Sequence, residues 1–150
     1  MLSTTEIAED IAEDLLFRSG RAMLDGNEDD LVACFWVPAV FETVEGVSHI
    51  QTIKELRDVY RNVYRNLKRN GVTDMARTVV SAQFINSNII GTTHVAVRLG
   101  PDGEHVGKPY PVYSTLKQVK SEWRIESCIY AVLNDPRMNK ALSLQPQKVS

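Results

Sequence analysis

Residues 22–46, AMLDGNEDDLVACFWVPAVFETVEG, decide the fold because they place a helix end, a helix start, a proline and a strand in direct succession. Gly26 follows the first helical pattern, and glycine adopts the left-handed conformation that ends a helix without a Cβ clash. Asn27 is then a suitable N-cap, and residues 28–30 place three carboxylates at the positive end of the helix dipole. The acidic cluster therefore predicts a helix start rather than a metal site.

The second predicted helix continues from these acids until Pro38, which removes a backbone hydrogen-bond donor. Its expected buried side consists of Leu31, Val32, Phe35 and Trp36. Residues 39–44 are then expected to form a short strand, and a loop containing Gly46 and His49 follows it.

Capping boxes mark two further helices, one formed by Ser3 with Glu6 and one by Thr52 with Glu55. Apolar residues recur at helical spacing after each box, so we predict a first helix that ends at Gly26 and a third that ends at 70–71. The third helix also has a basic face: Lys54, Arg57, Arg61, Arg65, Lys68 and Arg69. Solvation is the simpler interpretation of that face, and binding of an acidic partner is the alternative.

After Thr73 the periodicity of the sequence changes to two. Four runs at 76–85, 88–99, 108–119 and 122–133 are rich in Val, Ile, Thr and aromatic residues, and turn residues separate them. Such strands predict an antiparallel meander. We therefore expect an α+β fold in which three N-terminal helices pack on a curved antiparallel sheet, a cystatin-like cone, with residues 134–150 as a polar C-terminal tail.

The composition restricts the class of protein. A chain of 150 residues suits one domain over 1–150, and 17 basic against 19 acidic residues disfavour a nucleic-acid binder. No run approaches the roughly 18 apolar residues of a membrane span, and the N-terminus lacks the pattern of a signal peptide. Cys34 and Cys128 are expected to be buried free thiols, which favours a cytoplasmic setting. We expect no metal, no cofactor, no nucleic acid and no membrane partner.

Three stretches resemble the nuclear-transport-factor-2-like (NTF2-like) superfamily, whose cone domains include ketosteroid isomerases and SnoaL-like cyclases. They are 22–46, quoted above, 50–63 (IQTIKELRDVYRNV), which is similar to the family's third helix, and 115–132 (TLKQVKSEWRIESCIYAV), which is similar to its last hairpin. The resemblance covers roughly residues 7–133. It implies a pocket between the first helices and the concave face of the sheet, and homodimers that pack through the outer face.

The resemblance allows the catalytic residues of two kinds of superfamily enzyme to be compared with this sequence. Isomerases of the superfamily use a carboxylate base, a tyrosine and a protonated acid, and their pattern falls here on Thr43, Ser19 and Thr115, none of which has the required chemistry. SnoaL-like cyclases suggest a histidine paired with an acid, and His94 is the one histidine in a predicted strand. Because Thr93, Val95 and Val97 are expected to face inward, we expect His94 to face outward without a catalytic role.

The remaining site prediction is a small-molecule pocket. If it is catalytic, we expect Glu126 to be the acid/base, with Tyr60 and Tyr113 as hydrogen-bond donors. The expected ligand-binding residues are Phe35, Thr43, Thr115, Cys128 and Tyr130. Their aromatic rings and hydroxyls suit a mid-sized, partly polar organic ligand.

Two functions stay open at this point. The first is a binder or enzyme of the cyclase, isomerase or dehydratase type acting on an unidentified organic molecule. The second is a non-catalytic ligand carrier, or a dimerising interaction domain with a closed pocket. An open cavity of ~300 Å³ or more with a buried carboxyl group would favour the first. A filled cone with an exposed apolar sheet face would favour the second.

Overall fold

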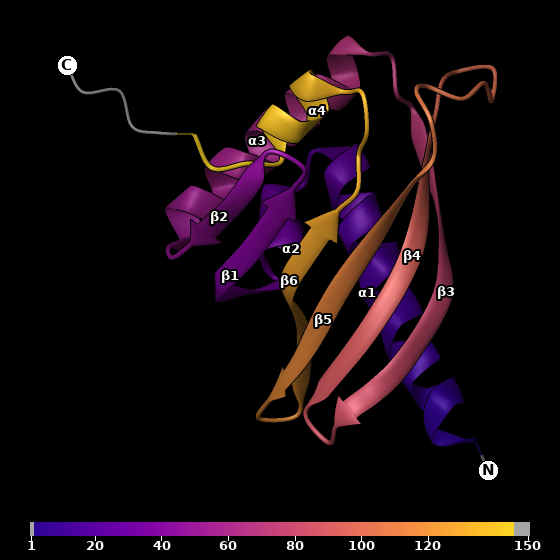
Figure 1. Cartoon of the computed structure of the whole chain (residues 1–150), viewed down its shortest axis with the longest axis vertical. Coiled ribbons are helices and arrows are strands. Elements are labelled where there is room, and N and C mark those ends of the chain that lie inside the picture. Colours follow the sequence, from indigo (N-terminus) through magenta and orange to yellow (C-terminus); the bar gives the residue numbers. More distant parts are fainter. Residues whose placement is uncertain (1, 146–150) are drawn as a thin grey trace.

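A computed structural model describes residues 2–145, which form one six-stranded sheet and four helices (Figure 1). The helices are α1 (Thr4–Asp25), α2 (Glu28–Val32), α3 (Ile53–Arg69) and α4 (Pro136–Ala141). The strands are β1 (Phe35–Thr43), β2 (Gly46–Ile50), β3 (Asp74–Asn86), β4 (Ile89–Leu99), β5 (Tyr110–Val119) and β6 (Glu122–Tyr130). None of the helices in this part of the chain is long and apolar enough to cross a membrane.

The predicted helix caps are confirmed. Ser3 and Thr52 each accept a hydrogen bond from the backbone of the glutamate three residues later, and that glutamate bonds back to the cap. Gly26 ends α1 with φ of 72°, a left-handed conformation that costs glycine little. The Asn27 side chain caps α2 by accepting from the backbone N–H of Asp30. Local hydrogen bonding therefore fixes where these helices begin and end.

The second helix is shorter than predicted. It ends at Val32, and Phe35 and Trp36 belong to β1 instead. Phe35 pairs with Ile125 of β6, and the indole Nε1 of Trp36 donates to the carbonyl of Lys117 over 2.7 Å. Pairing with the sheet thus overrides the helical spacing, and aromatic residues fit a pleated surface well.

The predicted antiparallel meander of β3 to β6 is confirmed, and two further strands extend it. The sheet order is β2-β1-β6-β5-β4-β3. Residues 46–50, expected as a loop, form β2 and pair with β1 in a hairpin. β1 runs parallel to β6, with Phe41 beside Cys128, so one pair of the sheet departs from the expected antiparallel pattern.

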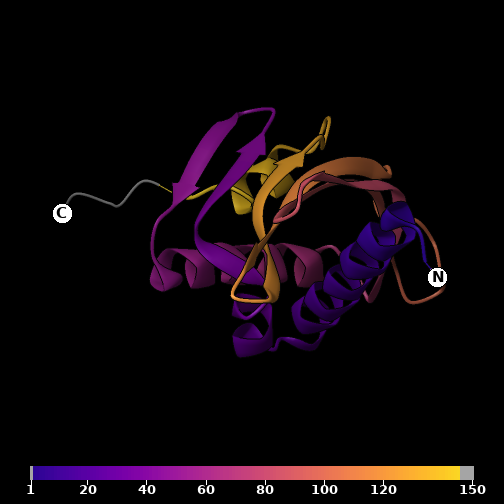
Figure 2. The same ribbon diagram turned by 90° about the horizontal axis from the view of Figure 1, so that it is seen from below.

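Helices cover the concave face of this curved sheet. In Figure 2 the sheet arches over α1 and α3, with α1 near β3 and α3 toward the β1–β2 hairpin. The predicted α+β class is confirmed, with a fourth helix in addition to the three expected. Leu15 on α1, Leu56 on α3 and Ile90 on β4 are fully buried between the two layers.

The expected polar tail includes that fourth helix. Asp135 caps α4 by accepting from the backbone of Met138, and it pairs with the buried Arg98 of β4 over 3.0 Å. The Met138 side chain is 1% exposed, and Leu142 is buried beside it. Residues 135–142 therefore close one end of the cone, which corrects the prediction of a polar tail over 134–150. Residues 146–150 of that predicted tail lie outside the described residues.

Candidate functional site

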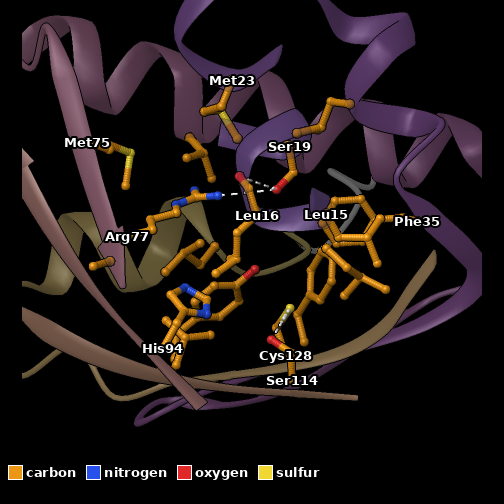
Figure 3. A pocket seen from close by; sticks show the side chains of 18 of the residues that line it. Leu15, Leu16, Ser19, Met23, Phe35, Met75, Arg77, His94, Ser114 and Cys128 are labelled. Carbon is orange, nitrogen blue, oxygen red and sulfur yellow. Dashed lines mark hydrogen bonds between the residues drawn. The ribbon is translucent and has the colours of Figure 1, made fainter. Parts of the chain in front are cut away.

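A cavity of about 80 Å³ lies between the helices and the inner face of the sheet (Figure 3). Its walls come from the four helices α1 to α4 and from the strands β1 and β3 to β6. Most of the lining is aliphatic or aromatic, as at Leu15, Phe35 and Val63. The polar lining includes Ser19, Tyr60, Arg77 and His94, and no carboxylate lines the cavity within residues 2–145.

Strand β4 has its polar residues inside and its valines outside. Thr92, His94, Ala96 and Arg98 are buried on the concave side, while Thr93, Val95 and Val97 alternate with them on the outer face. The prediction that His94 faces outward is therefore wrong, by one residue of register. Alternation usually places apolar residues inside, whereas on β4 the inner face is the more polar of the two.

Half of the predicted site residues line the cavity. Phe35 of β1, Tyr60 of α3, and Cys128 and Tyr130 of β6 do so. Ser114 of β5, which was not predicted, donates a hydrogen bond to the Cys128 sulfur over 3.4 Å. Both cysteines are buried free thiols, as expected, and burial raises the pKa of each.

Glu126, Tyr113, Thr115 and Thr43 do not line the cavity. Tyr113 and Thr115 alternate with the buried Val112, Ser114 and Leu116 of β5, so they face outward. The Thr115 hydroxyl donates to Glu126 Oε1 over 3.3 Å and contacts the Ser127 hydroxyl. Thr43 is buried at the end of β1, where its hydroxyl accepts from the backbone N–H of Glu45.

A β-bulge in β6 explains the orientation of Glu126. Thr115 pairs with Ser127 while Leu116 pairs with Ile125, so Glu126 is the extra residue on its strand. A bulge shifts the side-chain alternation by one position. Cys128 and Tyr130 consequently face the cavity, whereas the expected acid/base residue does not, and the expected group of Glu126, Tyr60 and Tyr113 is not brought together.

Arg77 is the residue with a permanent positive charge in the cavity lining. Its Nη1 donates to the Ser19 hydroxyl on α1 over 3.3 Å, and its Nε is buried without a hydrogen-bond partner. None of the ion pairs among residues 2–145 involves Arg77. The guanidinium group packs against α1 at Gly20, where a Cβ would lie 3.5 Å from Arg77 Nη1, an ordinary van der Waals contact.

His94 is neutral near pH 7. Burial, and then the charge of Arg77, lower its pKa from 6.5 to about 3. Its Nδ1 is buried and has no hydrogen-bond partner in the described part of the chain. The Tyr60 hydroxyl is likewise buried and unpartnered, and burial raises the pKa of Tyr60, so it also stays neutral. Buried polar atoms normally have partners, and these three atoms of the cavity lining have none among the described residues.

A second hollow adjoins the cavity on the outside. A surface groove of about 260 Å³ lies between α1 and β3, and Leu16, Met75 and Arg77 line both the groove and the cavity. The three shared side chains have several rotatable bonds and none is β-branched, so they can change rotamer more easily than Val or Ile. They form the partition between the interior and the solvent, and we refer to them below as the partition.

Residues 2–145 contain no group of three or more His, Cys, Asp or Glu side chains arranged to hold a metal ion. The acids at the start of α2 have structural roles instead. Glu28 pairs with Arg57 over 2.8 Å and with Arg61 over 2.9 Å, and these two hydrogen-bonded arginines lower the pKa of Glu28. Part of the basic face of α3 thus pairs with α2.

Residues 16–131 match the family described as NTF2-like protein (DUF6841). The chain belongs to this NTF2-like family. The resemblance to the NTF2-like superfamily that the sequence suggested is confirmed. No curated protein matches the sequence of this NTF2-like chain.

Solved structures with low sequence identity share the fold of the NTF2-like chain. A domain of unknown function with a cystatin-like fold from Nostoc punctiforme has a TM-score of 0.69 at 20% identity, with 86% of this chain and 79% of that one covered. Aln2 from a Streptomyces species has a TM-score of 0.68 at 16% identity, with 88% and 94% covered. An NTF2-like protein of unknown function from Shewanella oneidensis has a TM-score of 0.67 at 10% identity, with 81% and 97% covered. These similarities support the cystatin-like cone.

Proposed function

We propose that this NTF2-like protein binds a compact organic molecule in the cavity of its cone. The observation that carries the proposal is the group of buried, unpartnered polar atoms in the cavity lining: Tyr60 Oη, Arg77 Nε and His94 Nδ1. Leaving such a group without a partner costs about 1–3 kcal/mol. A ligand with matching polar atoms would remove that cost, and the apolar lining would hold its hydrocarbon part.

The small volume of the cavity limits which ligands fit and how they can enter. A cavity of 80 Å³ is smaller than the roughly 150 Å³ that accommodates benzene in a dry engineered cavity. A larger molecule therefore requires the partition of Leu16, Met75 and Arg77 to move, which would join the cavity to the 260 Å³ groove. The ligand is accordingly expected to be compact and to enter between α1 and β3.

The lining favours binding over proton abstraction. A histidine with a pKa of about 3 is a weak base near pH 7, and no carboxylate lines the cavity within the described residues.

The unpaired thiols of Cys34 and Cys128 are in keeping with a reducing cytoplasm as the place of action.

The test compares a cavity-filling variant with a matched control. Ala96 is buried in the cavity wall on β4, whereas Ala76 is exposed on the neighbouring β3. Wild type, Ala96→Leu and Ala76→Leu would be titrated with cyclohexanone, benzyl alcohol, benzamide and benzoate and followed by amide NMR shifts. We expect saturable shifts around His94 and Tyr60 in wild type and Ala76→Leu, and at least a tenfold weaker response in folded Ala96→Leu. If no probe shifts these amides, or if Ala96→Leu binds as wild type does, the proposal is wrong.

The outer face of the sheet supports a second function, assembly into a homodimer. Val40, Tyr113 and Ile129 lie on the neighbouring strands β1, β5 and β6 and are 37%, 40% and 43% exposed. Val95 and Val97 extend this apolar face on β4. An outer face more apolar than the inner one on the same strand would be stabilised by a second copy, and the family resemblance implies that pairing.

Sedimentation equilibrium of wild type and two variants tests the dimer. Ile129→Lys places a charge on the outer face, whereas Ile7→Lys places one at a similarly exposed position, 40%, on α1. We expect wild type and Ile7→Lys to sediment as dimers and Ile129→Lys as a monomer. A monomeric wild type would refute the proposed assembly, and an unchanged Ile129→Lys dimer would place the interface elsewhere.

A further inference from the structure

The charge balance of the cavity suggests which class of ligand it selects. Arg77 contributes a guanidinium group to the lining, and no described Asp or Glu does. Arg77 is partly exposed and also lines the outer groove, but its Nε is buried, and a buried charged group is normally compensated by a partner because leaving it uncompensated is costly. Ser19 occupies one donor of Arg77, and the buried Nε is unpartnered. The donor capacity of the guanidinium group, five N–H bonds in a planar fork, is therefore largely unused by side chains of the lining.

On the cavity side, the groups near Arg77 are neutral donors rather than competing anions. His94 is a diagonal neighbour of Arg77, since Arg77 pairs with Ala96 and Val79 pairs with His94. Figure 3 shows both side chains pointing into the same space from adjacent strands. An imidazole can donate at one nitrogen, and the Tyr60 hydroxyl from α3 can donate as well. The cavity thus offers hydrogen-bond donors from β3, β4 and α3 with no built-in acceptor of matching charge.

Two carboxylates lie on the outer side of the partition. Glu13 and Asp74 line the outer groove together with Arg21, which pairs with Asp25 over 3.1 Å. Neither Glu13 nor Asp74 forms an ion pair with Arg77. The guanidinium group instead points inward to Ser19, so its charge is available to the interior.

We propose that the cavity selects a compact organic monoanion, with a carboxylate held by Arg77 and hydrogen-bonded by His94, and with its hydrocarbon part against the aliphatic lining. This inference rests on the proposed function and specifies its ligand class. A planar carboxylate matches the guanidinium fork in a bidentate pair. A neutral amide of the same shape fills the same space without neutralising Arg77.

Three matched pairs of probes test the charge directly: acetate with acetamide, butyrate with butyramide, and benzoate with benzamide. Dissociation constants would be measured by calorimetry at pH 7 for wild type and for Arg77→Met, Arg77→Lys and Arg18→Met. Arg77→Met removes the charge and keeps an unbranched chain. Arg18 lies on α1, pairs with Asp14 and does not line the cavity, so Arg18→Met controls for net charge.

We expect at least one anion of the series to bind wild type and Arg18→Met at least tenfold more tightly than its amide. Arg77→Met should abolish that preference while amide binding persists, and Arg77→Lys should retain part of it. If the amides bind as tightly as the anions, or if folded Arg77→Met keeps the preference, the inference is wrong while the proposed function stands. If wild type binds neither anions nor amides, but binds cyclohexanone or benzyl alcohol, the inference is wrong as well. Absence of binding by every probe contradicts the proposed function itself.

Discussion

Arg77 and His94 are diagonal neighbours on the concave face of the sheet, on adjacent strands, with no carboxylate in the cavity lining of residues 2–145. Two groups that can each carry a positive charge would repel if both were protonated. Burial and the charge of Arg77 lower the pKa of His94 to about 3, so the two groups are not both charged near pH 7. The folded protein therefore keeps the imidazole of His94 neutral. The pH dependence of the free energy of unfolding tests this.

We predict that His94 makes the protein less stable in acid. The unfolded state takes up a proton near pH 6.5, whereas the folded state resists protonation until about pH 3. Stability therefore falls as the pH drops through this window, with a slope from this residue that approaches about 1.4 kcal/mol per pH unit. Chemical denaturation of wild type and His94→Gln between pH 7 and 5 measures the difference in slope.

His49 and His105 provide the control, since both side chains are exposed to solvent in the folded protein. Replacing either by Gln should leave the slope between pH 7 and 5 unchanged. His94→Gln should flatten the slope, even if it alters the stability at pH 7. An unchanged slope in His94→Gln would mean that the folded protein accepts the proton as readily as the unfolded chain does.

A second prediction concerns Gly107, in the connection between β4 and β5. Gly107 has φ of 72°, and a Cβ there would lie 2.5 Å from Arg98 Nη2. Arg98 cannot move away easily, because its side chain is 3% exposed, pairs with Asp135 and lies over the Tyr110 ring. Gly107→Ala should therefore lower the free energy of unfolding through both backbone strain and this steric conflict.

Gly103 in the same connection separates the two contributions. Its φ is 79°, and nothing lies within 4 Å of the position of an added Cβ. Gly103→Ala should cost roughly 1–2 kcal/mol from the left-handed backbone alone. Gly107→Ala should cost at least about 1 kcal/mol more, in line with overpacking elsewhere. Equal losses in urea denaturation would mean that Arg98 rearranges freely.

The helix ends could be predicted from the sequence because their signals are local. The capping boxes at Ser3 and Thr52 and the left-handed Gly26 need no distant partner, and each is found as expected. The end of α2 could not be predicted in this way. Phe35 and Trp36 pair with distant residues, Ile125 and Lys117, and no local pattern specifies that contact.

The site was only partly predictable because side-chain direction in a strand depends on register. The pattern on β4 favoured Val95 and Val97 as inward residues, and the structure buries His94 and Arg98 instead. The bulge at Glu126 then changed the alternation within β6. Arg77 was not identified because it is the one charged residue in a run of strand-forming residues, and only the fold shows that it lines a cavity without a counterion.

The last prediction tests whether α4 belongs to the core. The sequence of residues 134–150 suggested a polar tail, yet Met138 is 1% exposed and lines the cavity, while its neighbour Arg137 is exposed. Met138→Ala should lower the free energy of unfolding by about 2–5 kcal/mol, because it removes buried methylenes and enlarges a hollow. Arg137→Ala, on the same helix, should change it by less than about 0.5 kcal/mol. Urea denaturation with an unchanged m-value would attribute the loss to the folded state. If Met138→Ala proves as neutral as Arg137→Ala, residues 135–142 do not close the cone, and the cavity is open at that end.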